Sequence, residues 1–147
     1  MRVAREVALA APAARVWEAL WDVPRMVGCV PGCVEAHEVV PRRRYQARMS
    51  QKVGPIALSV PLDIHVTDAA PGRLALEARG RDRLLAAEVQ VSVRLEVDAI
   101  DAGSRLVLEA EGRVLGKLGA LGAAAIQRRA EELVDEFAAR LRGELEG

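Results

Sequence analysis

The two histidines are the side chains best suited to acid–base chemistry near neutral pH. His37 follows a turn and stands among charged residues, and His65 falls in the polar phase of an alternating segment. Both placements are typical of an imidazole in water. No serine nucleophile motif, glycine-rich phosphate loop or pair of carboxylates in apolar phases accompanies them. The sequence therefore predicts no catalytic residue and favours a protein that is not an enzyme.

Cys29 and Cys33, four residues apart, are the next candidates for chemistry. Two thiolates can share a metal ion, but a structural site needs further Cys or His ligands, and none stands at the usual spacing. The intervening Pro31-Gly32 turn permits a reversible disulfide if it brings the two Cα atoms within about 7 Å. The pattern favours a third interpretation, in which both cysteines are small buried residues at the rim of a cavity. We expect no metal and no cofactor.

One basic cluster, Arg42-Arg43-Arg44, follows Pro41. It is typical of a solvated hairpin turn, and the alternative is a docking patch for an acidic partner. Over the whole chain 21 basic residues balance 21 acidic ones, so the formal net charge is zero. A chain with this balance has no excess of positive charge to attract nucleic acid. We therefore expect partners among neutral or apolar molecules.

Length and composition predict a single globular domain over residues 1–147. A chain of this length buries enough surface to fold without a disulfide or a metal. The N-terminal segment lacks the continuous apolar stretch of a signal peptide, and no segment approaches the roughly 18 to 20 apolar residues of a membrane span. We expect a cytoplasmic protein.

Hydrophobic periodicity indicates the elements that position these side chains. Residues 2–9 alternate as a strand, and residues 14–21 and 24–30 are expected to form two short helices. Between residues 34 and 114 the period is two, and each run has one apolar and one polar face. This pattern indicates an antiparallel meander. Pro61 lies in the polar phase of one run, where we expect an edge position or a bulge.

A long C-terminal helix is predicted over residues 116–145 from an apolar stripe at helical spacing. About 30 residues at 1.5 Å each span roughly 45 Å, so the helix must lie along the sheet. The order of elements predicts an α+β fold of the helix-grip type, in which a curved antiparallel sheet of about seven strands surrounds the long helix.

The first part of this helix suggests a cavity. Residues 116–125 have small side chains, and their three glycines cost a helix roughly 3 kcal/mol relative to alanine. Either the backbone packs very close to the sheet there, or space is left for a bound molecule. We favour a cavity facing Met49, Gln51 and Val53, because a single Phe and a single Tyr leave few large side chains to fill it. Gln51 is a candidate polar contact for a ligand, or it bonds a strand end beside Gly54.

Four segments carry a resemblance to a known family. They are residues 12–20 (PAARVWEAL), the turn at 29–33 (CVPGC), the stretch 52–56 (KVGPI) and the C-terminal helix from residue 118 to 141, which ends in FAARL. The Pro-Gly turn, followed about twenty residues later by Val-Gly-Pro, is the most specific feature. Over essentially the whole chain the sequence resembles the CoxG family, the G-subunit family of carbon monoxide dehydrogenase. That family lies in the START-like, or polyketide cyclase and lipid-transfer-like, superfamily.

The resemblance implies a helix-grip fold with an internal cavity and a non-catalytic accessory role beside molybdenum-dependent hydroxylases. That role is maturation, membrane recruitment or the handling of an apolar electron acceptor such as a quinone. Many members extend into a membrane-anchoring tail, whereas this sequence ends at Gly147, so we expect at most peripheral membrane contact. Residues 79–85 (RGRDRLL) replace the glycine-rich stretch of the family, a departure that bears on partner recognition.

The sequence thus favours non-enzymatic binding of a lipid-like or quinone-like small molecule, in an accessory protein to a molybdenum hydroxylase of the carbon monoxide dehydrogenase type. The alternative is a polyketide cyclase-like or hydrolase-like enzyme, which needs ionisable side chains converging in the same cavity. A domain with a filled core that acts only through its surface is a third interpretation. The residues expected to line the cavity are Met26, Val30, Met49, Gln51, Val53, Leu58, Leu62, Val91, Val93, Leu108, Leu118, Leu121, Gly122 and Ala125.

Overall fold

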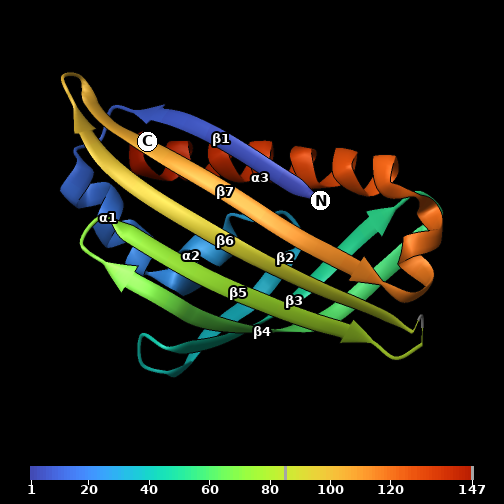
Figure 1. The fold of residues 1–147 in the computed structure, drawn as a ribbon. Helices are drawn as coiled ribbons and strands as arrows, with labels where there is room; N and C mark the ends of the chain where they lie inside the picture. The colour runs from blue at the N-terminus through green and yellow to red at the C-terminus, as the bar shows by residue number, and fades with distance from the viewer. Residues whose placement is uncertain (85, 147) are drawn as a thin grey trace.

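A computed structural model describes residues 1–84 and 86–146, and within them seven strands form one sheet (Figure 1). The strands are β1 (Arg2–Leu9), β2 (Cys33–Val40), β3 (Arg44–Val53), β4 (Ile56–Ala70), β5 (Arg73–Asp82), β6 (Ala87–Ile100) and β7 (Gly103–Leu115). The helices are α1 (Ala13–Trp21) and α2 (Val23–Gly28) after β1, and the 3₁₀ helix η1 (Gly116–Leu121) and the α-helix α3 (Ala123–Glu146) after β7.

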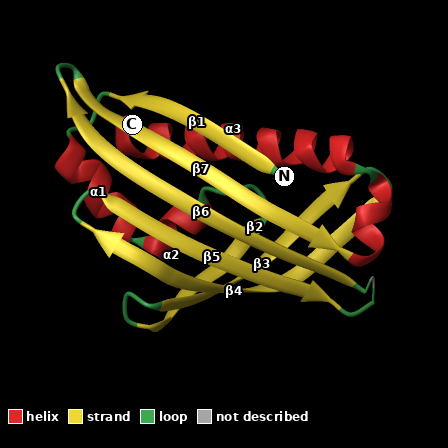
Figure 2. Ribbon diagram, in the orientation of Figure 1, coloured by secondary structure: helices red, strands yellow, loops and turns green. Residues whose placement is uncertain are grey.

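The sheet is an antiparallel meander in the order β1-β7-β6-β5-β4-β3-β2. Strands β4, β6 and β7 are 15, 14 and 13 residues long, and strands of this length accumulate enough twist to coil the sheet. The helices α1, α2 and α3 lie on its concave side (Figure 2). This arrangement confirms the predicted α+β helix-grip fold.

Pro61 illustrates how the chain accommodates a residue without a backbone N–H. In β4 it pairs with Arg48 of β3, but the pairing of β4 with β5 begins one residue later, at Leu62 opposite Gly80. Pro61 therefore has a partner strand on one side only. This is the edge position predicted for it. The backbone N–H that proline lacks is not needed there, because no neighbouring strand would accept its hydrogen bond.

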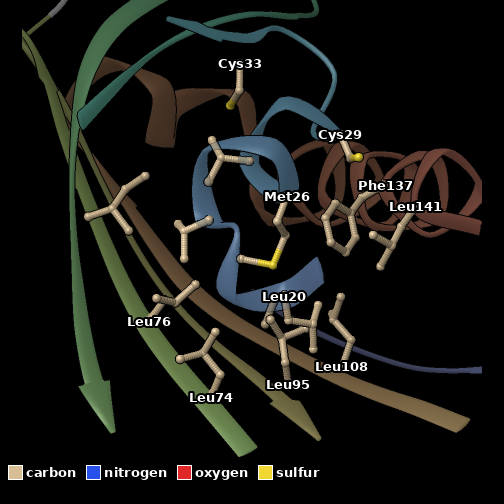
Figure 3. Packing of buried hydrophobic residues seen from close by; sticks show 14 of the residues in the cluster. Leu20, Met26, Cys29, Cys33, Leu74, Leu76, Leu95, Leu108, Phe137 and Leu141 are labelled. Carbon is tan, nitrogen blue, oxygen red and sulfur yellow. The ribbon is translucent and has the colours of Figure 1, made fainter. Parts of the chain in front are cut away.

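The tightly packed part of the core lies at one end of the sheet, against α1, α2 and the C-terminal half of α3. Leu20 of α1 and Leu106 of β7 have no exposed surface, and Phe137 and Leu141 of α3 are 7% and 3% exposed. Figure 3 shows these two α3 side chains beside Met26 of α2. This end of the molecule is a conventional apolar core, and it anchors the helix on the sheet.

Helix α3 is bound to β1 by polar contacts spaced along its whole length. Gln127 bonds the backbone N and O of Arg2, Asp135 accepts from Arg5 Nε at 2.8 Å, Arg142 donates to the Ala8 carbonyl at 3.0 Å, and Glu146 accepts from Ala10 N at 2.7 Å. On its other side α3 approaches β3, while the central strands stay farther from it. No helix in the described residues has the length and apolar character needed to cross a bilayer.

The predicted start of the C-terminal helix is wrong by about two turns. Residues 116–121 form η1, and α3 begins only at Ala123. Glycine geometry explains the difference, because Gly116 and Gly122 have φ values of +84° and +90°, which an α-helix does not allow. A Cβ on Gly116 would also lie 1.8 Å from the carbonyl oxygen of Ala86. Gly116 allows a close approach to the backbone of Ala86, and Gly122 allows the chain to reverse direction. Neither glycine is part of α3.

Replacement of Gly122 by alanine tests this explanation. With φ +90° and ψ 151°, Gly122 occupies a region that side chains rarely enter, yet an added Cβ would meet no atom within 4 Å. We expect Gly122→Ala to lower the free energy of unfolding by about 1–3 kcal/mol through backbone strain alone. Gly119→Ala is the matched control, since its Cβ would come no closer than 3.9 Å to Val114 O and its φ is unstrained. Urea unfolding of both variants measures the difference, and equal effects would contradict the explanation.

Candidate ligand-binding cavity

A partly enclosed cavity of about 270 Å³ lies between the concave face of the sheet and the N-terminal half of α3. The α3 residues that line it run from Ile126 to Phe137, and every strand of the sheet contributes to the opposite wall. The cavity ends where the packed core begins, at Met26 and Phe137. It is therefore a gap left in the middle of the fold.

The cavity exists because α3 contacts β1 on one side and β3 on the other, while short side chains face α3 from the strands between them. Ala78 of β5 and Val91 and Val93 of β6 point inward, yet none of them is fully buried, because they border the cavity. The one phenylalanine of the chain, Phe137, lies at the inner end and fills none of the central space. The wall consists almost entirely of carbon atoms. A cavity with such a wall offers few partners to water and favours apolar guests.

Ten of the fourteen residues expected at the cavity lie in its wall. They are Met26, Val30, Met49, Gln51, Val53, Leu58, Leu62, Val91, Val93 and Leu108. The alternation of the strands identified eight of them, all except Met26 and Val30, since inward phases of a curved sheet converge on one space. That they touch a bound molecule remains a prediction.

The glycine-rich end of the predicted helix is displaced from the cavity. Leu121, Gly122 and Ala125 do not line it, and the side chain of Leu118 lies outside the part of the chain that the structure describes. The turn at Gly122 carries this segment toward the β3–β4 hairpin, where Leu121 Cδ2 would lie 3.6 Å from a Cβ on Gly54. In the cavity wall, α3 residues from Ile126 onward take the place expected for Leu121, Gly122 and Ala125 opposite Met49, Gln51 and Val53.

Several lining residues were absent from the expected set. They are Met1, Val3, Val27, Cys33, Ile64, Leu76, Ala78, Val89, Leu95, Ala110, Val114, Ile126, Arg129, Ala130, Leu133, Val134 and Phe137. The strand members share the inward phases already recognised. Helical periodicity could have identified the α3 residues, because Arg129 lies three residues after Ile126 and four before Leu133, on the same face of the helix.

A chain of hydrogen bonds joins the Pro31-Gly32 turn to α3 through β3. The Gln51 side-chain amide donates to the Pro31 carbonyl, and Arg129 Nη2 donates to Gln51 Oε1 at 2.9 Å. Gly32 makes this possible, since a Cβ there would lie 2.1 Å from the Ser50 carbonyl oxygen against which the turn rests. Gln51 is 7% exposed, and it bonds the turn and α3 rather than a strand end beside Gly54.

The two histidines lie away from the cavity. His37 is exposed on β2, with Nδ1 3.0 Å from the carbonyl oxygen of Glu35, and His65 is exposed on β4. Neither residue is part of the cavity wall. In the described residues, no three His, Cys, Asp or Glu side chains are grouped so that they could hold a metal ion.

Both cysteines are buried free thiols. Cys33 lines the cavity, and burial raises the pKa of its thiol to about 11. Burial also raises the pKa of the Cys29 thiol. The two side chains lie apart in Figure 3, so each packs separately against its own neighbours. A thiol with a raised pKa is a weak nucleophile at neutral pH.

Arg42 and Arg43 of the basic cluster lie in the turn between β2 and β3, as predicted, and Arg44 begins β3. The Arg42 guanidinium lies 4.8 Å from the centroid of the Trp21 ring, a cation–π contact. Arg44 makes two hydrogen bonds, of 3.0 and 3.2 Å, to the carboxylate of Asp63. Two of the three arginines thus have intramolecular partners, and docking of an acidic partner here remains a prediction.

The same fold occurs in solved structures of low sequence identity. A conserved protein from Geobacillus kaustophilus is 20% identical, covers 99% of this chain and 95% of its own, and has a TM-score of 0.85. A START superfamily protein from Mycobacterium smegmatis is 14% identical, with 99% and 97% covered and a TM-score of 0.73. The Zhui aromatase/cyclase from Streptomyces sp. R1128 is 20% identical, with 99% and 93% covered and a TM-score of 0.69.

These likenesses establish a START-like fold and leave activity open, because one fold supports many functions. No protein of curated function matches the chain. The model of the carbon monoxide dehydrogenase G-subunit (CoxG) family matches residues 6–146, so the chain belongs to that family.

Proposed function

We propose that this protein binds an apolar small molecule, lipid-like or quinone-like, between the sheet and α3, and that it does so without catalysing a reaction. In this proposal it serves in the cytoplasm as an accessory protein to a molybdenum hydroxylase of the carbon monoxide dehydrogenase type. The observation that carries the proposal is the cavity wall, which consists almost entirely of carbon.

The size and chemistry of the cavity define what fits. Its volume of about 270 Å³ equals the space of roughly nine liquid water molecules at about 30 Å³ each. That space suits a ring system or a short alkyl chain, and a longer tail would have to leave through the open side. Each 100 Å² of apolar surface removed from water contributes roughly 2.5 kcal/mol to binding. Apolar contact is therefore the main source of affinity in this proposal.

The accessory role rests on the family. The chain belongs to the CoxG family, which is named for carbon monoxide dehydrogenase. The carbon-rich cavity fits a carrier of ligands with an apolar body. Direct support would come from co-purification with a molybdenum hydroxylase encoded beside this protein.

An enzyme of the cyclase or hydrolase kind is the alternative. One solved structure with this fold is an aromatase/cyclase, but the described cavity wall contains no Asp, Glu, His or Lys side chain to act as a general base. Cys33 is the only thiol there among the described residues, and its raised pKa of about 11 keeps it protonated at neutral pH. The chemistry of the wall therefore supports binding over catalysis.

A filling substitution tests the binding site. Ala78 points into the cavity from β5, and Ala75 is on the opposite face of the same strand. We expect Ala78→Leu to weaken binding of the neutral fluorophore N-phenyl-1-naphthylamine at least tenfold, because the added side chain occupies the ligand's space. Ala75→Leu, the same change on the outer face, should alter the affinity by less than twofold. Fluorescence titration gives both values, and equal affinities for the two variants would refute the proposed location.

The same variant separates a cavity from a filled core by its stability. In a packed core, three added carbons cost about 1–3 kcal/mol through overpacking. In the cavity we expect Ala78→Leu to leave the free energy of unfolding unchanged or to raise it, since the new side chain gains contacts without displacing others. Urea unfolding measures this, and a loss within the overpacking range would mean that the space is not available.

Alkylation of Cys33 is expected to be slow and strongly pH-dependent. With a pKa of about 11, its thiolate fraction at pH 8 is more than roughly two hundredfold below that of an exposed cysteine with a pKa near 8.5. In the Cys29→Ser variant, iodoacetamide should therefore label the folded protein at least a hundredfold more slowly than the unfolded chain. The rate should rise about tenfold per pH unit between pH 8 and 10. Mass spectrometry follows the reaction, and rapid labelling of the folded protein at pH 8 would contradict a buried thiol.

A further inference from the structure

Arg129 is the one charged side chain in the described wall of the cavity. It projects from α3 on the face that also carries Ile126 and Leu133, and 28% of its side chain is exposed. A guanidinium at an apolar wall is energetically unfavourable, because charged groups are costly to withdraw from water unless they are paired.

The hydrogen bonds of Arg129 leave part of its donor capacity unused. Nη2 donates to Gln51 Oε1 at 2.9 Å, and Nη1 donates to Glu132 Oε2 at 3.0 Å. Nε is buried and has no hydrogen-bond partner among the described residues. Gln51 cannot serve it with its amide nitrogen, which is a donor and is already bonded to Pro31. An unpartnered buried donor on a cation marks a place where an acceptor is missing.

The charge of Arg129 is only weakly compensated by the protein. Its ion pair with Glu132 is on the solvent side of the helix, where 52% of the Glu132 side chain is exposed, and exposed pairs of this kind contribute little. The bond to Gln51 is to a neutral oxygen. No carboxylate of the described chain lines the cavity.

We infer that Arg129 binds the carboxylate of an anionic amphiphile whose apolar body occupies the cavity. The Nε and Nη2 atoms form one edge of the guanidinium, and two parallel N–H donors match a carboxylate in bidentate fashion. To reach this edge the carboxylate takes the place of Gln51 Oε1 on Nη2. Gln51 then keeps its bond to Pro31, so the turn stays in position. This inference rests on the proposed function and adds to it the class of head group.

The test compares two probes that differ only in charge at one end. Decanoate and methyl decanoate present the same acyl chain, as an anion and as a neutral ester. We expect isothermal titration calorimetry on the unaltered protein to give at least tenfold tighter binding for decanoate. Equal affinities for the two probes would overturn the inference while leaving the proposed function intact. Failure of both probes to bind would overturn the proposed function, and the inference with it.

Two variants then assign the preference to one side chain. Arg129→Met keeps an apolar stem of similar length, and it should lower the affinity for decanoate at least tenfold while changing that for methyl decanoate by less than twofold. Arg128→Met is the matched control, because Arg128 is exposed and is not part of the cavity wall. It should preserve the preference for the acid. A preference that survives in Arg129→Met would refute the role of Arg129, and the comparison of probes on the unaltered protein stays decisive if that variant does not fold.

Discussion

The separation between α3 and the central strands is the constraint on which the rest of the structure depends. The helix is tied along its length to β1 and meets β3 on the other side, through Arg129 and Gln51. Because α3 is held by β1 and β3 at its two sides and the sheet is curved, space remains between the middle of the helix and the sheet. The C-terminal half of α3 packs against the sheet through Phe137 and Leu141, and the N-terminal half leaves the space open. One helix thus closes a core at one end and covers a cavity at the other.

The cavity lowers the stability of the empty protein. At roughly 24 cal/mol per Å³, about 270 Å³ of unfilled space costs up to the order of 6 kcal/mol. That figure is comparable with the whole stability of many domains. A chain that keeps Ala78, Val91 and Val93 where larger side chains would fit forgoes this packing energy. A bound apolar molecule restores it, so occupancy and stability are linked.

Much of the architecture was predictable because it depends on local periodicity. Period-two runs specified the inward faces of the strands, and these supplied the correctly placed residues, such as Val91 and Leu108. The cavity lies about two to three turns further along the C-terminal helix than the sequence predicts. The small side chains of residues 116–125 suggest a cavity wall. In the structure, Gly116 and Gly122 have positive φ values, which the tertiary fold imposes and the local sequence does not show. Arg129 lay on the correct helical face, but its partner Gln51 is on a strand 78 residues away, and no local pattern shows that contact.

In the proposed function, the cavity holds an apolar molecule. Mass spectrometry of the protein purified gently from its native host tests this most directly, first under native conditions and then after denaturation. We expect a native mass that exceeds the chain mass by one small molecule, and release of that apolar molecule on denaturation. Repeated recovery of the protein at its bare chain mass, with nothing released, would contradict it.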